Sequence, residues 1–242
     1  MFWYIDHMPR NRSASVSARA RVRAELTGEI KATARRHVAE AGAASLSLRA
    51  VAREMGMASS ALYRYFASRD ELLTALIVDA YDTVGAAAEE AAATRGGTVK
   101  RFMAVATAIR AWAVANPHDY ALVYGSPVPG YQAPQDTVPP AARVSLAALG
   151  IVADGVASGE VDTAATSPTP RAVGADFRRL RAAAGLDIPD DVLSRALLAW
   201  TTIFGTLTFE LFGHLHRVVE NYDDYFDHQI RRAARHIVTG DA

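Results

Sequence analysis

Apolar residues recur every three or four positions through most of the chain, which is the spacing of one face of an α-helix. The first such run extends from Val22 to Ala41, and Gly42 follows it. No segment alternates apolar and polar residues with the two-residue period of a half-buried strand. The pattern therefore predicts an all-α fold whose first helix covers residues 22–41.

Three more helices are expected shortly afterwards. A short run has helical spacing at Leu48, Val51, Ala52 and Met55. Ser47 is placed to cap that helix, and Gly56 is placed to end it in the left-handed conformation. A second short helix is predicted from about Ser59 to Phe66, with Leu62 facing inward. The sequence Ser68-Arg69-Asp70-Glu71 is typical of a capping box and predicts the start of a fourth helix, which ends before Gly96-Gly97.

The remaining two-thirds of the chain is expected to be helical as well. Pro117 ends one helix, because the residue before a proline is pushed out of the helical region, and the prolines of residues 126–140 predict a loop. Helices are predicted at residues 99–115, 141–158, around 177, 190–215 and 222–238.

Composition and charge narrow the class of protein. The 242 residues carry no net charge and are half hydrophobic, which is typical of a globular protein. The absence of cysteine excludes disulfides, thiolate zinc sites and cysteine nucleophiles, and favours a cytoplasmic protein. The apolar run at residues 196–209 is shorter than the roughly 20 residues that span a bilayer, so no membrane contact is expected.

Charge is distributed unevenly along the chain. Residues 1–70 contain 12 Lys and Arg against 6 Asp and Glu, whereas residues 71–242 contain 14 against 20. A basic front and an acidic remainder indicate that only the front of the chain meets a polyanion.

The two short helices around Gly56 have the organisation of a helix-turn-helix, which presents its second helix to the major groove of DNA. Leu62 anchors that second helix to the core, and Ser59, Ser60, Tyr63 and Arg64 face outward. A helical hairpin with an ordinary polar face is the alternative interpretation.

The segment LSLRAVAREMGMASSALYRYFASRDELL, residues 46–73, resembles the DNA-binding domain of the TetR family of transcriptional regulators. The resemblance implies that Ser47 contacts phosphate and that Tyr63 contacts phosphate or a base. It also places Arg64 and Tyr65 at positions that commonly touch DNA, and Arg69 at the position of a basic residue that grips the DNA backbone. Tyr65 could instead pack against the first helix.

The chain departs from the family's pattern at Ala58, Ser59 and Ala61, where the family often has serine, lysine and threonine. This departure shifts base reading toward Arg64, because a guanidinium can bond guanine at two points in the major groove.

The resemblance also implies the domain organisation. Residues 1–20 are expected to form a flexible basic arm, residues 21–68 the helix-turn-helix domain, and residues 69–242 a helical domain that binds a small effector and dimerises. Dimerisation would use the helices at 190–215 and 222–238, so that a homodimer reads a pseudo-palindromic site in double-stranded DNA. The arm could contact DNA or could be a solvated tail.

Large side chains on the interior helices predict an effector pocket. The candidate residues are Phe102, Trp112, Tyr120, Tyr124, Trp200 and Phe204. Each of them could equally be plain core, but a buried tyrosine hydroxyl can orient a ligand in an apolar cleft. Since no charged cluster accompanies them, an uncharged, largely apolar effector is expected. The stretch WTTIFG is similar to a family subtype named for a Trp-His-Gly pattern, with Phe204 at the histidine position.

Other functions have less support in the sequence. An enzyme is not expected, because the sequence has neither the GxSxG nor the GxGxxG motif and no recognisable catalytic dyad. A metal-responsive regulator could use Glu210, His214 and His216, but their spacings of four and two do not keep one helical face. A DNA-binding protein without effector control remains the other alternative, and no cofactor is expected.

Overall fold

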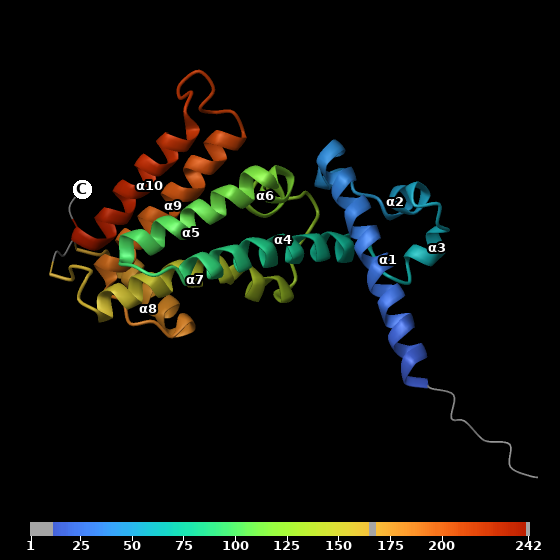
Figure 1. Cartoon of the computed structure of the whole chain (residues 1–242), viewed down its shortest axis with the longest axis horizontal. Helices are drawn as coiled ribbons and strands as arrows, with labels where there is room; N and C mark the ends of the chain where they lie inside the picture. The colour runs from blue at the N-terminus through green and yellow to red at the C-terminus, as the bar shows by residue number, and fades with distance from the viewer. Residues whose placement is uncertain (1–11, 165–167, 241–242) are drawn as a thin grey trace, which may run out of the picture. The chain divides into compact units, whose positions relative to one another are not determined.

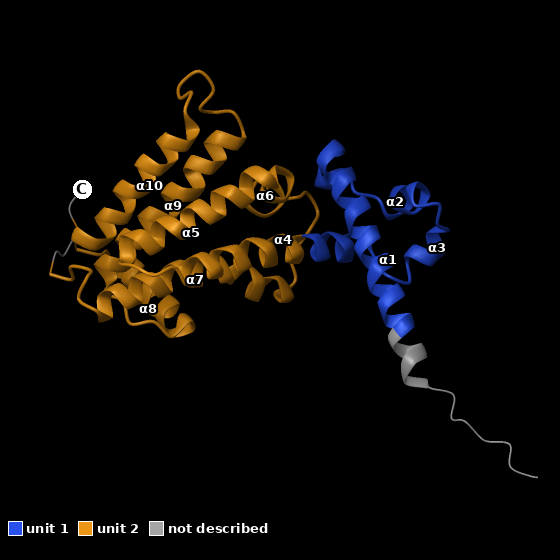
Figure 2. Ribbon diagram, in the orientation of Figure 1, with its two compact units in different colours: residues 1–76 blue, residues 77–242 orange. Residues whose placement is uncertain are grey.

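The computed structural model describes residues 12–164 and 168–240, and within these ranges the chain contains helices and no strands (Figure 1). The predicted all-α fold is confirmed. The chain divides into two compact units, unit 1 (residues 1–76) and unit 2 (residues 77–242) (Figure 2). The division falls inside one continuous helix, α4 (Arg69–Ala92).

Unit 1 contains three short elements between α1 (Arg12–Ala41) and the first turns of α4. These elements are η1 (Ala43–Ser45), α2 (Leu48–Glu54) and α3 (Ser59–Leu62). Every helix of the unit contributes to its core, which contains the fully or almost fully buried side chains Ile30, Ala34, Leu48, Val51, Ala52, Leu62, Leu72, Leu73 and Leu76. Each large apolar side chain buried in this way stabilises the fold by about 1.5–3 kcal/mol.

Helix α1 begins well before the predicted start at Val22, at Arg12. The residues from Arg12 to Arg21 contain no glycine or proline, so nothing in them interrupts a helix. The apolar spacing that begins at Val22 therefore does not mark the start of the helix. Residues 12–20 of the predicted flexible arm are helical, and its residues 1–11 lie outside the described residues.

The turn between α2 and α3 has the predicted chemistry. The Ser47 hydroxyl oxygen accepts a hydrogen bond from the Ala50 amide at 3.4 Å, and Gly56 has a φ of 65°. Helix α3 is shorter than predicted, because after Leu62 the chain tightens: the Tyr65 amide donates to the Leu62 carbonyl at 2.8 Å. This tightening leads to Phe66, which is 5% exposed.

The predicted capping box begins α4. The Glu71 amide donates to the Ser68 hydroxyl at 3.1 Å, and a Glu71 carboxylate oxygen accepts from the Ala67 amide at 2.5 Å. The predicted domain boundary after Ser68 differs from the observed division after Leu76, because the first turns of α4 supply buried leucines to unit 1.

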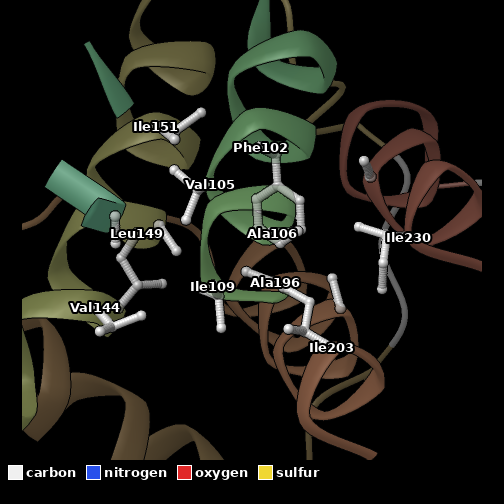
Figure 3. Close-up of a cluster of buried hydrophobic side chains, with 14 of the residues drawn as sticks. Phe102, Val105, Ala106, Ile109, Val144, Leu149, Ile151, Ala196, Ile203 and Ile230 are labelled. Carbon is white, nitrogen blue, oxygen red and sulfur yellow. The ribbon is translucent and has the colours of Figure 1, made fainter. Parts of the chain in front are cut away.

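Unit 2 is built around α5 (Thr98–Ala115), which packs against α7 (Val138–Ala157) and α10 (Tyr222–Thr239). Helix α10 also packs along α9 (Asp190–Leu211), and α8 (Arg171–Ala184) packs against α9. Figure 3 shows the resulting core, in which α5 supplies Phe102, Val105 and Ile109.

Prolines account for two differences from the predicted helices of unit 2. A helix that was not predicted, α6 (Pro117–Tyr124), begins at the proline that ends the preceding helix. Helix α7 begins at Val138, directly after η2 (Gln135–Thr137), with Pro139 and Pro140 in its first turn. Proline is tolerated in a first turn because the amide it lacks has no partner there.

Two segments of unit 2, Gln135–Ala157 and α9, are long and apolar enough to cross a membrane by length and composition. Both supply side chains to the core of unit 2, among them Val144 and Ile203. Their apolar character is explained by this packing, so it does not indicate a membrane protein.

Candidate functional site

The outward face of α3 and the turn after it gathers four of the predicted DNA-binding residues. Ser59, Ser60, Tyr63 and Arg64 are all exposed, and the Tyr63 side chain is 46% exposed. Leu62, between them in sequence, is fully buried and holds the segment to the core. Hydroxyl, phenol and guanidinium groups are therefore presented together on a firmly packed element.

Arg64 is held by its backbone and not by its side chain. Its carbonyl accepts a hydrogen bond from the Arg23 guanidinium at 3.0 Å. Among the described residues, the Arg64 guanidinium itself has no ion-pair or hydrogen-bond partner. The side chain is thus free to bind an external anion or the edge of a base.

Tyr65 has a different environment from Tyr63. It is only partly exposed, and the Arg23 guanidinium lies 5.0 Å from the centre of its ring. A cation over an aromatic face stabilises a structure by about 0.5–1 kcal/mol at an exposed site. The structure therefore favours packing against α1 as the role of Tyr65.

Arg69 is engaged within unit 1. Its guanidinium donates to the carbonyls of Ala43 and Ala44 at 2.9 and 3.3 Å, and to the Asp70 carboxylate at 3.0 Å. Since Ala43 and Ala44 belong to η1, Arg69 holds the turn that leads to Ser47. These contacts indicate that Arg69 positions the start of α2.

Two arginines of α2 were not among the predicted site residues. Arg49 and Arg53 are exposed, lie four residues apart, and have no ion-pair partner among the described residues. The signal was present in the sequence, because both lie opposite the buried positions of α2. Glu54, the acidic residue beside them, is bound by Arg36 at 2.7 Å, and this hydrogen bond lowers the pKa of Glu54.

Unit 2 contains an apolar cavity of about 500 Å³ between α5, α7, α8 and α9. We call it the α8 cavity. Two predicted ligand-binding residues, Phe102 and Trp200, line it, together with leucines of α7, α8 and α9. Ser145 provides the hydroxyl of the lining, and none of the lining side chains carries a charge. Its volume and apolar lining are typical of a small-molecule site.

Four of the six predicted ligand-binding residues, Trp112, Tyr120, Tyr124 and Phe204, do not line this cavity. The Trp112 indole donates to the Thr83 hydroxyl at 3.0 Å. The Tyr120 hydroxyl lies 3.2 Å from the Phe204 carbonyl and 2.9 Å from the Thr208 hydroxyl. Because both polar groups are satisfied inside the core, the structure favours a packing role for Trp112 and Tyr120.

Tyr124 and Phe204 lie in a row of aromatic rings that extends from the α8 cavity. The Trp200 and Phe204 ring centres are 4.6 Å apart, and those of Phe204 and Tyr124 are 4.4 Å apart. Tyr81 continues the row at 6.0 Å from Tyr124. Burial raises the pKa of Tyr124, so its hydroxyl stays protonated.

The structure gives no support to a metal site at Glu210, His214 and His216. Arg110 binds both carboxylate oxygens of Glu210 at 2.7 and 3.0 Å and also pairs with Asp223 at 2.7 Å. No group of three metal-binding side chains occurs in the part of the chain that the structure describes.

The outer side of α9 is apolar and uncovered. Leu198 is 56% exposed, Phe209 52% and Phe212 43%, and Thr201 and Gly205 are exposed between them. The spacing of these residues places them along one side of the helix. We call this set the α9 stripe, and it lies on the helix that was predicted to dimerise.

Comparisons with known proteins identify the same family for the first and the second part of the chain. Residues 30–76 match the family described as bacterial regulatory proteins, tetR family, and residues 102–233 match the tetracyclin repressor-like C-terminal domain. The HTH-type transcriptional regulator Rv1816 of Mycobacterium tuberculosis is 42% identical over 203 residues, which cover 82% of this chain and 86% of that protein. The HTH-type transcriptional regulator Mb1846 of Mycobacterium bovis has the same identity and coverage.

Solved structures show the same fold. The crystal structure of the regulatory protein SCO4313 has a TM-score of 0.73 and 36% identity, and the match covers 88% of this chain and 97% of that one. The TetR family regulator PfmR of Thermus thermophilus, at 15% identity and a TM-score of 0.54, covers 86% of this chain and 96% of its own and supports the fold alone. The exposed helix-turn-helix, the helical second unit and these relatives together show that the chain is a DNA-binding regulator, not an enzyme, and that it belongs to the TetR family of transcriptional regulators.

Proposed function

We propose that the protein is a cytoplasmic, homodimeric repressor that binds a pseudo-palindromic operator and is released by a small, uncharged, apolar effector bound in the α8 cavity. The observation that carries DNA recognition is the unengaged Arg64 guanidinium on a rigid, exposed face. Ser47, Ser59, Ser60 and Tyr63 would add phosphate or base contacts beside it.

Selection of bound duplexes from a random pool tests this recognition. The full-length protein is expected to enrich one sequence with two-fold symmetry, its half-sites about 34–36 Å apart or a multiple of that distance. An enriched pool without symmetry, or no enrichment over the starting pool, would contradict the proposal.

The α9 stripe supports the dimer. An isolated helix face with three large exposed apolar side chains is stabilised when a second copy covers it, and a two-fold axis brings the same face from both chains together. The groove beside the stripe, about 310 Å³ and lined by Gly205 and Phe209, offers room for a side chain of the partner subunit.

Sedimentation at low micromolar concentration tests the dimer. The wild type is expected to sediment as a dimer and Phe209→Glu as a folded monomer, because a buried unpaired carboxylate opposes association. Val114→Glu is the matched control, since Val114 of α5 is also half exposed but lies outside the stripe. A dimer that persists in Phe209→Glu would place the interface elsewhere.

Effector control is supported by the lining of the α8 cavity. A bound apolar compound should raise the melting temperature and lower DNA affinity, because the two effects are linked when the ligand prefers the DNA-free form. Trp200→Leu should weaken this response, whereas Trp112→Phe should leave it unchanged, since Trp112 does not line the cavity.

A regulator without effector control is the second candidate. Such a regulator would bind the same operator. Apolar compounds could still raise its melting temperature, but its DNA affinity would stay the same. That outcome would leave DNA recognition intact and would assign the α8 cavity to packing.

A further inference from the structure

A second cavity lies close to the α8 cavity. It has a volume of about 610 Å³ and is bounded by α4, α6, the start of α7 and the loop of residues 125–137. We call it the loop cavity. The lining includes Tyr81 of α4 and Tyr131 of the loop, and the prolines of this segment restrict the loop's backbone.

The two cavities share part of their lining. Val138 and Ala142, one turn apart on α7, line both of them. The row of aromatic rings also links the two cavities. Trp200, at one end of the row, lines the α8 cavity, and Tyr81, at the other end, lines the loop cavity. The two cavities thus adjoin at Val138 and Ala142 of α7.

The two cavities differ in polarity. The α8 cavity is lined by aliphatic and aromatic side chains around Ser145. The loop cavity adds two phenols, Tyr81 and Tyr131, and the hydroxyls of Ser126 and Thr137. The Tyr81 hydroxyl donates to the Val123 carbonyl at 3.2 Å, which leaves its oxygen lone pairs able to accept.

The loop cavity favours an uncharged polar group. Burial raises the pKa of Tyr81, and the nearby Tyr131 raises it further, so the phenol stays neutral at physiological pH. No Asp, Glu, Lys, Arg or His occurs in the described lining of either cavity. A charged head group would therefore have no counter-ion in the lining.

We propose that the two cavities form one elongated site for an uncharged long-chain molecule with a hydrogen-bond donor in its head group, a fatty alcohol or a primary amide, whose tail fills the α8 cavity and whose polar head lies in the loop cavity. The inference rests on the proposed effector function and specifies the chemical class of the effector. The head group donates a hydrogen bond to the Tyr81 hydroxyl oxygen, and the chain crosses beside Val138 and Ala142.

Binding of straight-chain 1-alkanols to the full-length protein, without DNA, tests the proposal by calorimetry and tryptophan fluorescence. Octanol is expected to occupy two places per chain, one in each cavity. Dodecanol is expected to bind once per chain and to exclude octanol from both places. Affinity should rise about fourfold for each added methylene, which corresponds to about 0.8 kcal/mol. A plateau beyond octanol, or octanol binding beside bound dodecanol, would overturn the single elongated site.

A wall variant sharpens the test. Ala142→Leu enlarges a side chain that lines both cavities, so dodecanol should bind no more tightly than octanol while octanol is retained. Ala183→Leu is the matched control, because Ala183 lines the α8 cavity alone. Its enlargement should weaken dodecanol and the octanol bound in the α8 cavity, and should leave the octanol of the loop cavity in place. Equal losses in the two variants would contradict the shared path. If Ala142→Leu does not fold, the competition between alcohols in the wild type decides the question.

The outcomes separate this inference from the proposed function. If no alkanol binds while another apolar compound raises the melting temperature and lowers DNA affinity, the elongated site fails and the proposed function stands. If octanol binds and lowers DNA affinity while dodecanol does neither, the proposed function stands and the elongated site fails.

Discussion

Most of the side chains expected to bind DNA on α3 of unit 1 lie in solvent, whereas the side chains expected to bind an effector in unit 2 lie in the core or pack against it. Arg64 and Tyr63 are exposed beside the buried Leu62, whereas Tyr120 is fully buried with its hydroxyl bonded inside the unit. An exposed guanidinium or phenol contributes little to the stability of the fold. Its presence in a helix-turn-helix therefore indicates a role in binding DNA. A buried aromatic contributes to folding in any case, so its presence does not identify a ligand site.

The arginines show the same contrast. In unit 2 they tie helices together: Arg143 of α7 binds Glu89 and Asp82 of α4, with its shortest contact at 2.6 Å. Arg195 is 4% exposed, pairs with Asp191 at 2.9 Å and donates to the Ile237 carbonyl at 2.7 Å. In unit 1, Arg49, Arg53 and Arg64 have no such partner among the described residues. The unpaired arginines on the α2–α3 face of unit 1 are available to a polyanion, and unit 2 also has exposed arginines, such as Arg95 and Arg171.

The largest expected effect tests the core assignment in unit 2. Tyr120→Ala should lower the free energy of unfolding by about 3–5 kcal/mol, because it leaves a cavity and unpairs the Thr208 hydroxyl. Tyr120→Phe keeps the ring and should cost about 0.5–1.5 kcal/mol. Urea unfolding measures both. A stable Tyr120→Ala variant that no longer responds to effector would make Tyr120 a ligand contact and remove the contrast.

The next effect tests the exposed arginine of unit 1. Arg64→Ala should weaken binding to the selected operator by about 1–3 kcal/mol and relax one base position, since alanine cannot form the bidentate hydrogen bonds to guanine. Fluorescence anisotropy on operator and random duplexes measures the difference, with Arg95→Ala of unit 2 as the matched exposed control. Equal losses on the two duplexes would mean that Arg64 contacts the DNA backbone.

Arg69 combines features of Tyr120 and Arg64. It is a basic residue of the helix-turn-helix unit, as Arg64 is, but its guanidinium is hydrogen-bonded within the unit, to the carbonyls of η1. Arg69→Ala should weaken binding to all sequences alike and also destabilise unit 1 by about 0.5–1.5 kcal/mol, since the Ala43 and Ala44 carbonyls lose their donor. DNA titrations and urea unfolding on the same preparation measure the two effects. A loss of DNA affinity without any loss of stability would assign Arg69 to direct phosphate contact.

The smallest effect concerns Glu54. Its pKa is lowered in the folded chain by hydrogen bonds from Arg36 and His37, so its contribution to stability is present above its ordinary pKa of about 4.5 and is lost as pH falls through the lowered value. The stability difference between wild type and Glu54→Gln should be constant above about pH 5 and shrink in more acid solution. Urea midpoints measured against pH check this. A difference that grows on acidification would contradict the assigned ion pair.

Much of the fold follows from local chemistry that the sequence displays. The cap at Ser47, the left-handed Gly56 and the capping box at Ser68 were predictable because each depends on residues within four positions. The end of α3 and the start of α1 were not, because apolar spacing reports contact with the core and not the extent of the helix. Pro117 predicts the end of one helix but also begins α6, since proline is compatible with both positions.

The proposed effector site was predictable only in part. Phe102 and Trp200 reach the α8 cavity, but whether a given aromatic lines a cavity or fills the core depends on helices far apart in the sequence. Leu180, the leucine of α8 that lines the cavity, could not be identified from spacing, because that helix was located only by Phe177.

The salt dependence of operator binding tests most directly whether DNA binds the α2–α3 face of unit 1. Three proteins are compared: the wild type, Arg49→Ala/Arg53→Ala, and the unit 2 control Arg95→Ala/Arg171→Ala, which also removes two exposed arginines. The slope of log affinity against log salt should become less steep by about 0.9 for each phosphate that the unit 1 variant no longer neutralises, and it should stay at the wild-type value in the control. Equal slopes for all three proteins, or a change in the control alone, would contradict this account.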